Sequence, residues 1–472
     1  MPALFSDSWY RVAALRPRLR RHAKIYRHVY RGHPWYVLED VANQRVHRFS
    51  PSTYAVVGLM DGERSVQEIW EHATDTLGDE GPTQDEVIRL FSQLHSADVL
   101  QCDVPPDTAE LLDRIQRRES HQLRSRFMNP FAIRIPLLDP DRFLVRSLPV
   151  LRPLLGWFGV AIWLAAVLSA LVLVGSHWSE LTEGFLDRVL APRNLVLIWL
   201  LFPVIKILHE LGHGVATRYF GGEVHDMGVM LLVFTPIPYV DASSASAFPE
   251  RSRRMLVAGA GMIVEVFLAA LAFHLWRAAE PGVVRTLAYN TMLIGGITTL
   301  TFNANPLLRF DGYYLLSDWL EIPNLRQRAN DYVGYLLERF GFGNRDALPP
   351  DAVGTEPAWL VTYSISAFVY RFFIIAFILT FVLDLSLVFG AILGAISAIG
   401  WLFLPLGKGV RALFGARLRR VRRRATLLVG GVTALLVFSI FFAPLPFRTL
   451  VEGVVWIPEE AMVRTEAEGF VA

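Results

Sequence analysis

The stretch ILHELGHGVATRYF, residues 207–220, places an H-E-x-x-H pattern at the end of a long apolar segment. On a helix, His209 and His213 project from one face, because residues four apart lie one turn above each other. Two imidazoles at this spacing can bind one zinc ion. Glu210, next to the first imidazole, can take a proton from a water molecule whose pKa the metal lowers. The pattern predicts a zinc centre on a helix that is otherwise built for an apolar environment.

The composition of the chain is that of a membrane protein. It has 472 residues, of which 53% are hydrophobic, and a mean hydropathy of +0.36. Apolar runs of about 20 residues are long enough to cross the hydrocarbon core as helices. We therefore expect an all-α polytopic membrane domain over residues 153–445 with about seven transmembrane helices, at 153–175, 194–217, 255–277, 284–304, 363–383, 386–406 and 425–443.

Charge sets the expected orientation in the membrane. The loop 407–424 has eight basic residues and no acidic one, which is typical of a cytosolic loop. Seven crossings that start from a cytosolic N-terminus place this loop inside and the C-terminus outside. The formal net charge of +2 gives no sign of nucleic-acid binding. The apolar spans make membrane lipids the expected surroundings. Cys102 is the only cysteine, which excludes an intrachain disulfide and a cysteine-ligated zinc site.

A catalytic zinc ion needs a third protein ligand and an open position. Asp311, in FNANPLLRFDGYYLL, is the best candidate, because it follows the fourth expected helix at the depth of His213. Taken alone, an Asp-Gly pair is usually a turn. Asn303 and Asn305 precede it and could hold a substrate carbonyl or an oxyanion. The alternative is that these two amides break the helix and bond the backbone.

Two ionisable residues interrupt the apolar segments. An ionised carboxylate such as Glu265 at mid-helix costs about 2.5–3.5 kcal/mol on insertion scales. We expect it to face the protein, either hydrogen-bonded to neighbouring helices or near the zinc site. Lys206, one turn before His209, is a candidate partner for it. In the loop 221–248, His225 and Asp226 are weaker candidates for contact with the metal, and Asp241 could cap a turn or line the site.

Residues 1–110 are patterned as a soluble domain. Short strand-like segments around 25–49 precede a helix that begins with Ser50 as its cap and Pro51 in its first turn. Two further segments, SVQEIWEHATDTL and TQDEVIRLFSQLHSADVL, have apolar residues at helical spacing. These features predict a small α+β winged-helix domain, followed by a basic linker over 111–152.

Three segments together resemble the site-2 protease class of intramembrane zinc metallopeptidases: HELGHGVATRYFGGEVHDMGVMLL, VAGAGMIVE and NANPLLRFDGYY. The resemblance implies a three-helix core over 194–312, with His209, His213 and Asp311 as zinc ligands and Glu210 as the catalytic base. It also implies that a strand after the first core helix pairs with an extended substrate. The middle helix departs from the usual pattern, since it has Gly261-Met262 and Glu265 where a Gly-Pro and a downstream Asn are common.

The longer pattern, including DGYYLLSDWLEIPNLRQRA, resembles a bacterial YydH-like branch of peptide zinc metalloproteases. Members of that branch often have a PqqD-like front domain and an HlyD-like tail. The front domain here is similar to the PqqD type, which implies leader-peptide binding; the alternative is a plain module that packs on the membrane part. Residues 446–472 resemble the start of an HlyD-like β fragment. The resemblance implies a bacterial inner membrane protein with an ABC exporter or HlyD-type partner.

The function expected from these features is zinc-dependent hydrolysis of a peptide bond near the cytosolic membrane face. The substrate would be a membrane peptide or a leader-bearing peptide. The main alternative is a component of a peptide export or immunity system that binds peptide without cutting it. Cleavage of an anti-sigma factor is disfavoured, because no PDZ-type domain is visible in the sequence.

Overall fold

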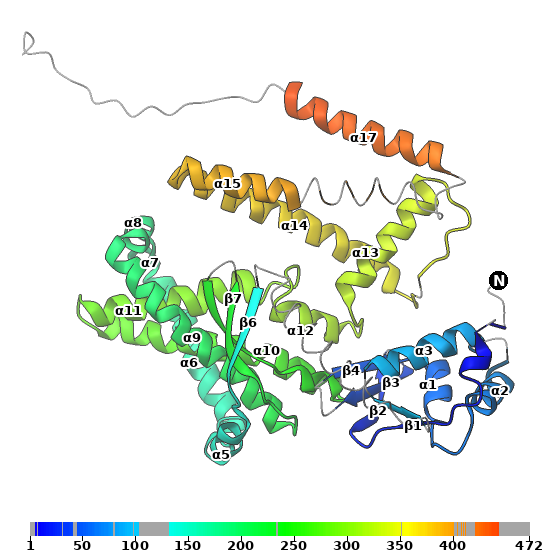
Figure 1. Ribbon diagram of the computed structural model, residues 1–472. Coiled ribbons are helices and arrows are strands. Elements are labelled where there is room, and N and C mark those ends of the chain that lie inside the picture. The colour runs from blue at the N-terminus through cyan, green and yellow to red at the C-terminus, as the bar shows by residue number, and fades with distance from the viewer. Residues whose placement is uncertain are drawn as a thin grey trace, which may run out of the picture. The chain divides into compact units, whose positions relative to one another are not determined.

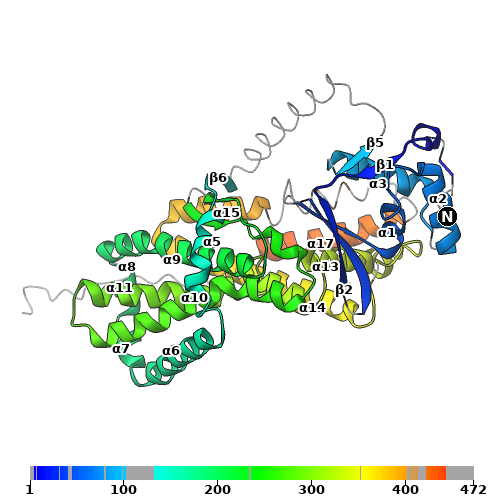
Figure 2. The same cartoon turned by 90° about the horizontal axis from the view of Figure 1, so that it is seen from below.

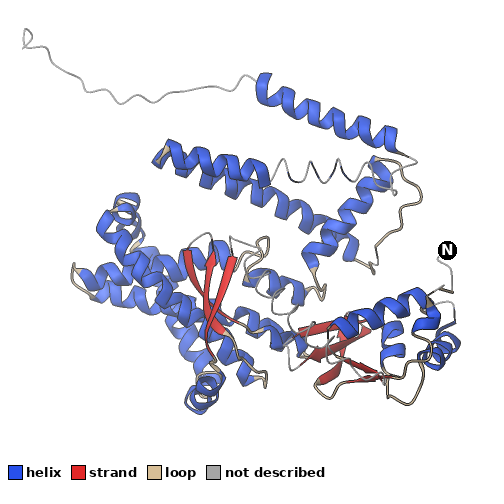
Figure 3. Ribbon diagram, in the orientation of Figure 1, coloured by secondary structure: helices blue, strands red, loops and turns tan. Residues whose placement is uncertain are grey.

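The computed structural model describes residues 5–102, 132–400 and 421–442, with short gaps at 7, 31, 41–44, 79–80, 98, 233–234 and 351, and isolated positions between 404 and 411. The protein is mostly helical, with a small sheet region near the N-terminus, as predicted (Figures 1 and 3). The chain divides into two compact units. The first comprises Met1–Asp331 and Ala352–Ile378, and the second comprises Tyr332–Asp351 and Leu379–Ala472.

The front domain combines an antiparallel sheet with three helices. The sheet has the order β2-β3-β4, and a separate pair joins β1 to β5. Ser50 caps the first helix as expected, and both later helices begin with a capping box, Ser65 with Glu68 and Thr83 with Glu86. The elements are η1 (Trp9–Arg11), β1 (Pro17–Leu19), β2 (Ala23–Tyr30), β3 (His33–Asp40), β4 (Arg45–Phe49), α1 (Pro51–Val57), α2 (Val66–Leu77), α3 (Gln84–Ser96) and β5 (Leu100–Cys102).

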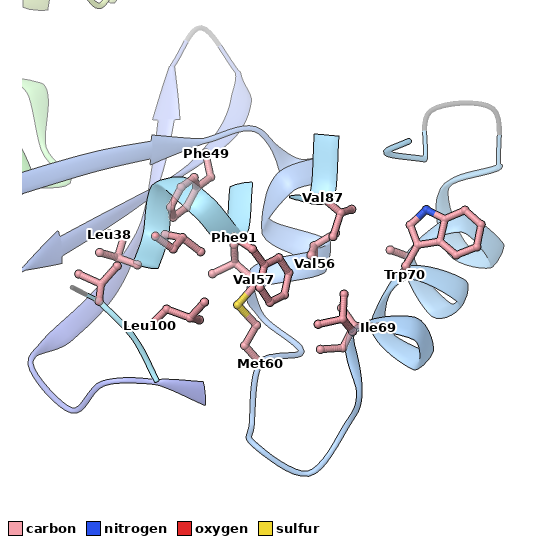
Figure 4. Close-up of a cluster of buried hydrophobic side chains, with 14 of the residues drawn as sticks. Leu38, Phe49, Val56, Val57, Met60, Ile69, Trp70, Val87, Phe91 and Leu100 are labelled. Atoms are coloured by element: carbon pink, nitrogen blue, oxygen red, sulfur yellow. The ribbon is translucent and has the colours of Figure 1, made fainter. Parts of the chain in front are cut away.

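One apolar core holds these elements together (Figure 4). Leu38 on β3, Ile69 on α2 and Leu94 on α3 are buried to within 2% of complete burial. Each comes from a different element, and on the helices they lie on the apolar stripe that the sequence spacing predicts. The front domain therefore has its own hydrophobic core.

Among the described residues, four helices are long and apolar enough to cross a membrane: α6 (Trp157–Ser176), α9 (Pro192–Tyr219), α10 (Arg251–Ala278) and α14 (Glu356–Leu385). α9 and α10 pack side by side (Figure 2). These helices are compatible with a membrane protein. The remaining helices are α5 (Asp141–Leu151), α7 (Trp178–Thr182), α8 (Phe185–Leu190), α11 (Val283–Met292), the π-helix η4 (Leu293–Asn303), α12 (Asp311–Trp319), α13 (Leu325–Leu336), the π-helix η5 (Leu337–Gly341), α15 (Leu387–Ala398) and α17 (Arg422–Phe442).

The other three expected spans take a different form. The fourth is divided between α11 and the π-helix η4, which follow each other without a break. The sixth corresponds to α15, a shorter apolar helix, and the seventh overlaps α17. The count of seven crossings therefore stays a prediction.

A second antiparallel sheet lies beside α9. It has the order β6-β7-β8, formed by Ala132–Leu138, Met227–Leu232 and Thr235–Val240, and the 3-10 turn η3 (Ser243–Ala247) follows it. The hairpin β7-β8 follows α9, where the resemblance implies a strand. β6 and α5 fall within 111–152, which was expected as a linker; residues 111–131 of that range lie outside the described part.

His28 on β2 connects the front domain to η3. It is buried, and its Nε2 donates a hydrogen bond to the Ala247 carbonyl oxygen at 3.0 Å. Burial lowers the pKa of His28 from 6.5 to about 4, and the nearby positive charges of Arg254 and Arg48 act in the same direction. The imidazole is therefore neutral in the folded protein at pH 5, where an exposed histidine is mostly protonated.

The lowered pKa of His28 predicts that the stability of its contact with η3 depends on pH. Because the folded pKa is depressed, the contact is fully stable above pH 6.5 and loses stability as the pH falls toward 4. Lowering the pH from 7 to 5 should destabilise it by about 2 kcal/mol. The hydrogen exchange of the backbone amides of β2, residues 23–30, should therefore be faster at pH 5 than at pH 7 once the rates are corrected for the intrinsic effect of pH. His28→Gln should show no such acceleration; a pH effect of the same size in that variant would contradict the assignment.

Candidate metal centre

The H-E-x-x-H segment forms one continuous helix, α9, and buries both imidazoles. His209 and His213 are 4% and 8% exposed. Helix α10 approaches them closely because it has a glycine at the crossing. A Cβ on Gly261 would lie 2.5 Å from His209 Nε2, so only a residue without a side chain fits there.

Asp311 reaches the same point from the start of α12. Its Oδ2 lies 3.0 Å from His209 Nε2 and 3.4 Å from His213 Nε2, and the two Nε2 atoms are 3.1 Å apart. Gly312 allows the approach, since a Cβ there would lie 2.4 Å from the Ala304 carbonyl oxygen. The three predicted ligands thus come together, and within the described residues they form the one group of this kind suited to a metal ion.

The hydrogen bonds of the two imidazoles indicate which ring nitrogen of each carries the proton and which has a free lone pair for a metal ion. His213 Nδ1 lies 2.7 Å from the Val257 carbonyl oxygen, which can only accept, so Nδ1 carries the proton and Nε2 the lone pair. His209 Nδ1 faces the Glu265 carboxylate at 3.3 Å, which favours the same tautomer. Asp311 Oδ2 is buried, and among the described residues no donor forms a good hydrogen bond with it.

The donor set fits a zinc ion. Two Nε2 atoms and one carboxylate oxygen face one another, and in these tautomers none of the three carries a proton. Ligands about 2.0–2.1 Å from a tetrahedral zinc ion are separated by about 3.3 Å. The observed separations of 3.0–3.4 Å agree with that geometry. A bound cation would remove the repulsion between these lone pairs.

Glu210 lies on the side of α9 that faces the second sheet. Its Oε2 accepts a hydrogen bond from the Val240 backbone N–H at 2.9 Å. This contact holds the carboxylate next to the end of β8. The proposed base and the strand are therefore neighbours.

The two ionisable residues of the apolar segments pair as expected. Lys206 Nζ lies 2.5 Å from Glu265 Oε1. Asn303 Nδ2 donates to Glu265 Oε2 at 3.2 Å, whereas Asn305 Oδ1 accepts from the Leu307 N–H at 2.9 Å. Asn305 thus has the backbone-bonding position of the two alternatives. A role of either amide toward substrate stays a prediction.

The loop residues that were weaker candidates bond elsewhere. His225 contacts Asp139 and Glu223 at the surface, and Asp241 Oδ1 accepts from the Ser243 N–H at 3.0 Å. Asp226 accepts from the Tyr239 hydroxyl at 2.9 Å. Burial, together with this hydrogen bond, raises the pKa of Tyr239 to about 12, so the hydroxyl remains a donor. None of the three belongs to the metal-binding group of the described residues.

Sequence reasoning missed one buried member of the site. Thr299 on η4 donates its hydroxyl hydrogen bond to Glu265 Oε2 and is fully buried. It lies four residues before Asn303 in an apolar segment. This spacing was the available signal that the two polar side chains share one face.

Comparison with family models, curated proteins and solved structures finds no match for this chain.

Proposed function

We propose that the chain is a membrane-embedded zinc metalloprotease of the site-2 protease type that hydrolyses a peptide bond near the cytosolic membrane face. The observation that carries this proposal is the convergence of the Nε2 atoms of His209 and His213 and a buried oxygen of Asp311, within 3.0–3.4 Å of one another. Glu210 follows His209 on the same helix. His209, His213 and Asp311 would hold the ion, and Glu210 would be the general base. A bound zinc ion would polarise the peptide carbonyl and lower the pKa of a water molecule.

The edge of β8 supports an extended substrate. Backbone groups of residues two apart point to the same side of a strand. The Val240 N–H points to Glu210, away from β7. The backbone carbonyl groups of Pro236 and Pro238 therefore face the same outer edge of β8. The prolines have no N–H, and that of Val240 is occupied, so this edge offers carbonyl oxygens alone. A peptide strand there would donate its own N–H groups and leave its carbonyls available for reaction.

The wider placement in the cell is part of the proposal. We infer a bacterial inner membrane protein with seven crossings, a cytosolic N-terminus, an extracytoplasmic C-terminus and an ABC exporter or HlyD-type partner. The stretch 446–472, expected to be HlyD-like, lies outside the described residues. In the front domain β4 is an edge strand. A pocket of about 640 Å³ is lined by Arg48 on β4 and by Arg89 and Gln93 on α3, and also by Ser246 and Asn324 from outside this domain. The pocket is suited to a peptide segment.

The same pocket favours a second function, peptide binding without cleavage as part of an export or immunity system. The two functions differ in whether the peptide is cut. In the first it is cut and the cleavage requires zinc; in the second it is only bound. A protein that binds peptide equally well with and without zinc, and never cleaves it, would fit the second.

The test is zinc content together with cleavage. The purified chain in liposomes should hold about one zinc ion, and Asp311→Ala should weaken zinc binding by more than about 100-fold, beyond the loss for an indirect partner. Asp241→Ala, an acidic residue outside the cluster, is the control. If a small precursor peptide is encoded beside the gene, it should be cut by the zinc-loaded chain and left intact after chelation. Full zinc occupancy without any cleavage would support the second function.

A further inference from the structure

Glu265 is a fully buried carboxylate in the middle of α10, with donors on both oxygens. Oε1 faces Lys206 Nζ, while Oε2 accepts from the Thr299 hydroxyl and from Asn303 Nδ2. These partners come from α9 and from the π-helix η4. A π-helix is rare and frequently occurs at functional sites.

The ion pair by itself does not explain this arrangement. A buried pair gains little over an apolar pair of the same volume, because both charges lose their hydration. The three polar partners of Glu265 are thus weak evidence for a stabilising role. They are strong evidence that its carboxylate is held in one orientation, with Oε2 fixed by two donors.

The atom that Oε2 faces is His209 Nδ1, at 3.3 Å. Nδ1 is buried, and no hydrogen bond with good geometry reaches it from any described residue. Glu265 Oε2 lies close enough that a small rotation of the ring would complete the bond. The other imidazole already has such a partner, since His213 Nδ1 donates to the Val257 carbonyl oxygen at 2.7 Å.

We propose that Glu265 is the positioning residue of the metal centre: its Oε2 accepts the Nδ1 proton of His209 and so directs the Nε2 lone pair to the ion. Lys206 contacts the other oxygen of this carboxylate, and Thr299 and Asn303 fix the oxygen that faces His209. Partners of this kind orient a ligating imidazole and raise its basicity. The inference rests on the zinc site proposed above and adds the residue that sets its affinity.

Two double variants separate positioning from packing. Lys206→Met with Glu265→Leu removes both charges and the acceptor. Lys206→Met with Glu265→Gln also removes both charges but keeps an acceptor, because the donors Thr299 and Asn303 direct the amide oxygen to the Oε2 position. The variants differ in whether residue 265 can accept the His209 proton.

We expect zinc affinity, measured by competition with a chromophoric chelator, to fall by about 10–100-fold in the leucine variant. The glutamine variant should recover a large part of that loss, and the visible absorption band of bound Co²⁺ should shift in the leucine variant alone. Asn290→Leu is the control for stability. It removes a buried hydrogen bond between α11 and Asn194 of α9, away from the metal, and should lower the melting temperature without changing zinc affinity.

The outcomes are distinguishable. Equal, wild-type zinc affinity in both double variants would overturn the positioning role while leaving the metal site intact. Loss of affinity in Asn290→Leu as large as in the leucine variant would also overturn it, because stability alone would explain the effect. A wild-type chain that binds neither Zn²⁺ nor Co²⁺ would instead refute the proposed function, and this inference with it.

Discussion

Glu210→Gln is expected to keep zinc bound and to lower the rate of peptide cleavage by about 10²–10⁴-fold, the contribution typical of a positioned general base. The amide has the shape of the carboxylate, and its oxygen can still accept the Val240 N–H that Glu210 accepts at 2.9 Å. We therefore expect the fold and the three proposed metal ligands to be unchanged. What is lost is the carboxylate that we propose takes the proton.

Zinc content, peptide affinity and single-turnover cleavage should be measured on the same samples. Glu223→Gln is the matched control, because it removes one negative charge from the loop that follows α9, where Glu223 contacts His225 at the surface. That variant should cleave normally. Normal cleavage by Glu210→Gln would show that another group removes the proton, and the proposed mechanism would be wrong.

The local part of the site could be predicted from the sequence, because it depends on spacing within one helix. The i, i+4 relation of His209 and His213 needs nothing beyond α9 itself. The pairing of Lys206 with Glu265 was also predictable, since a charge in an apolar segment needs a partner and few are present. The cap of the first front-domain helix is a similarly local signal, and the structure has it at Ser50, where the sequence predicts it.

The non-local part could not be predicted in this way. Strand β6 pairs with β7, so that Ile133 lies opposite Leu231, and no periodicity within either segment defines that register. The same limit applies to the carbonyl of Val257, a backbone group that any residue type would supply to His213. The fourth expected span is part α-helix and part π-helix, a difference that hydropathy does not encode. The convergence of Asp311 with the imidazoles was predicted from depth in the membrane. It also depends on the loop between η4 and α12, which places Asp311 next to the imidazoles.

Gly261→Ala is expected to abolish tight zinc binding, weakening it by at least about 100-fold, and to abolish cleavage with it. The added Cβ would lie 2.5 Å from both Cε1 and Nε2 of His209 and 2.6 Å from Cδ2. No rotation about the ring bond relieves three such contacts, so either the imidazole or helix α10 must move. Zinc ligands tolerate displacements of about 0.2 Å, and the relief of this contact requires several times that.

Gly259→Ala is the matched control, two residues away on the same buried helix. A Cβ there meets its nearest atom, Leu315 Cδ1, at 4.0 Å, which is an ordinary van der Waals contact. Because alanine favours a helix over glycine by about 0.8–1 kcal/mol, this variant should be as stable as the wild type or more so, with unchanged zinc affinity. Both variants make the same chemical change and differ in what the methyl group meets. If Gly261→Ala bound zinc as tightly as Gly259→Ala, the His209 ring could not lie against α10, and the ligand geometry derived from that contact would fail.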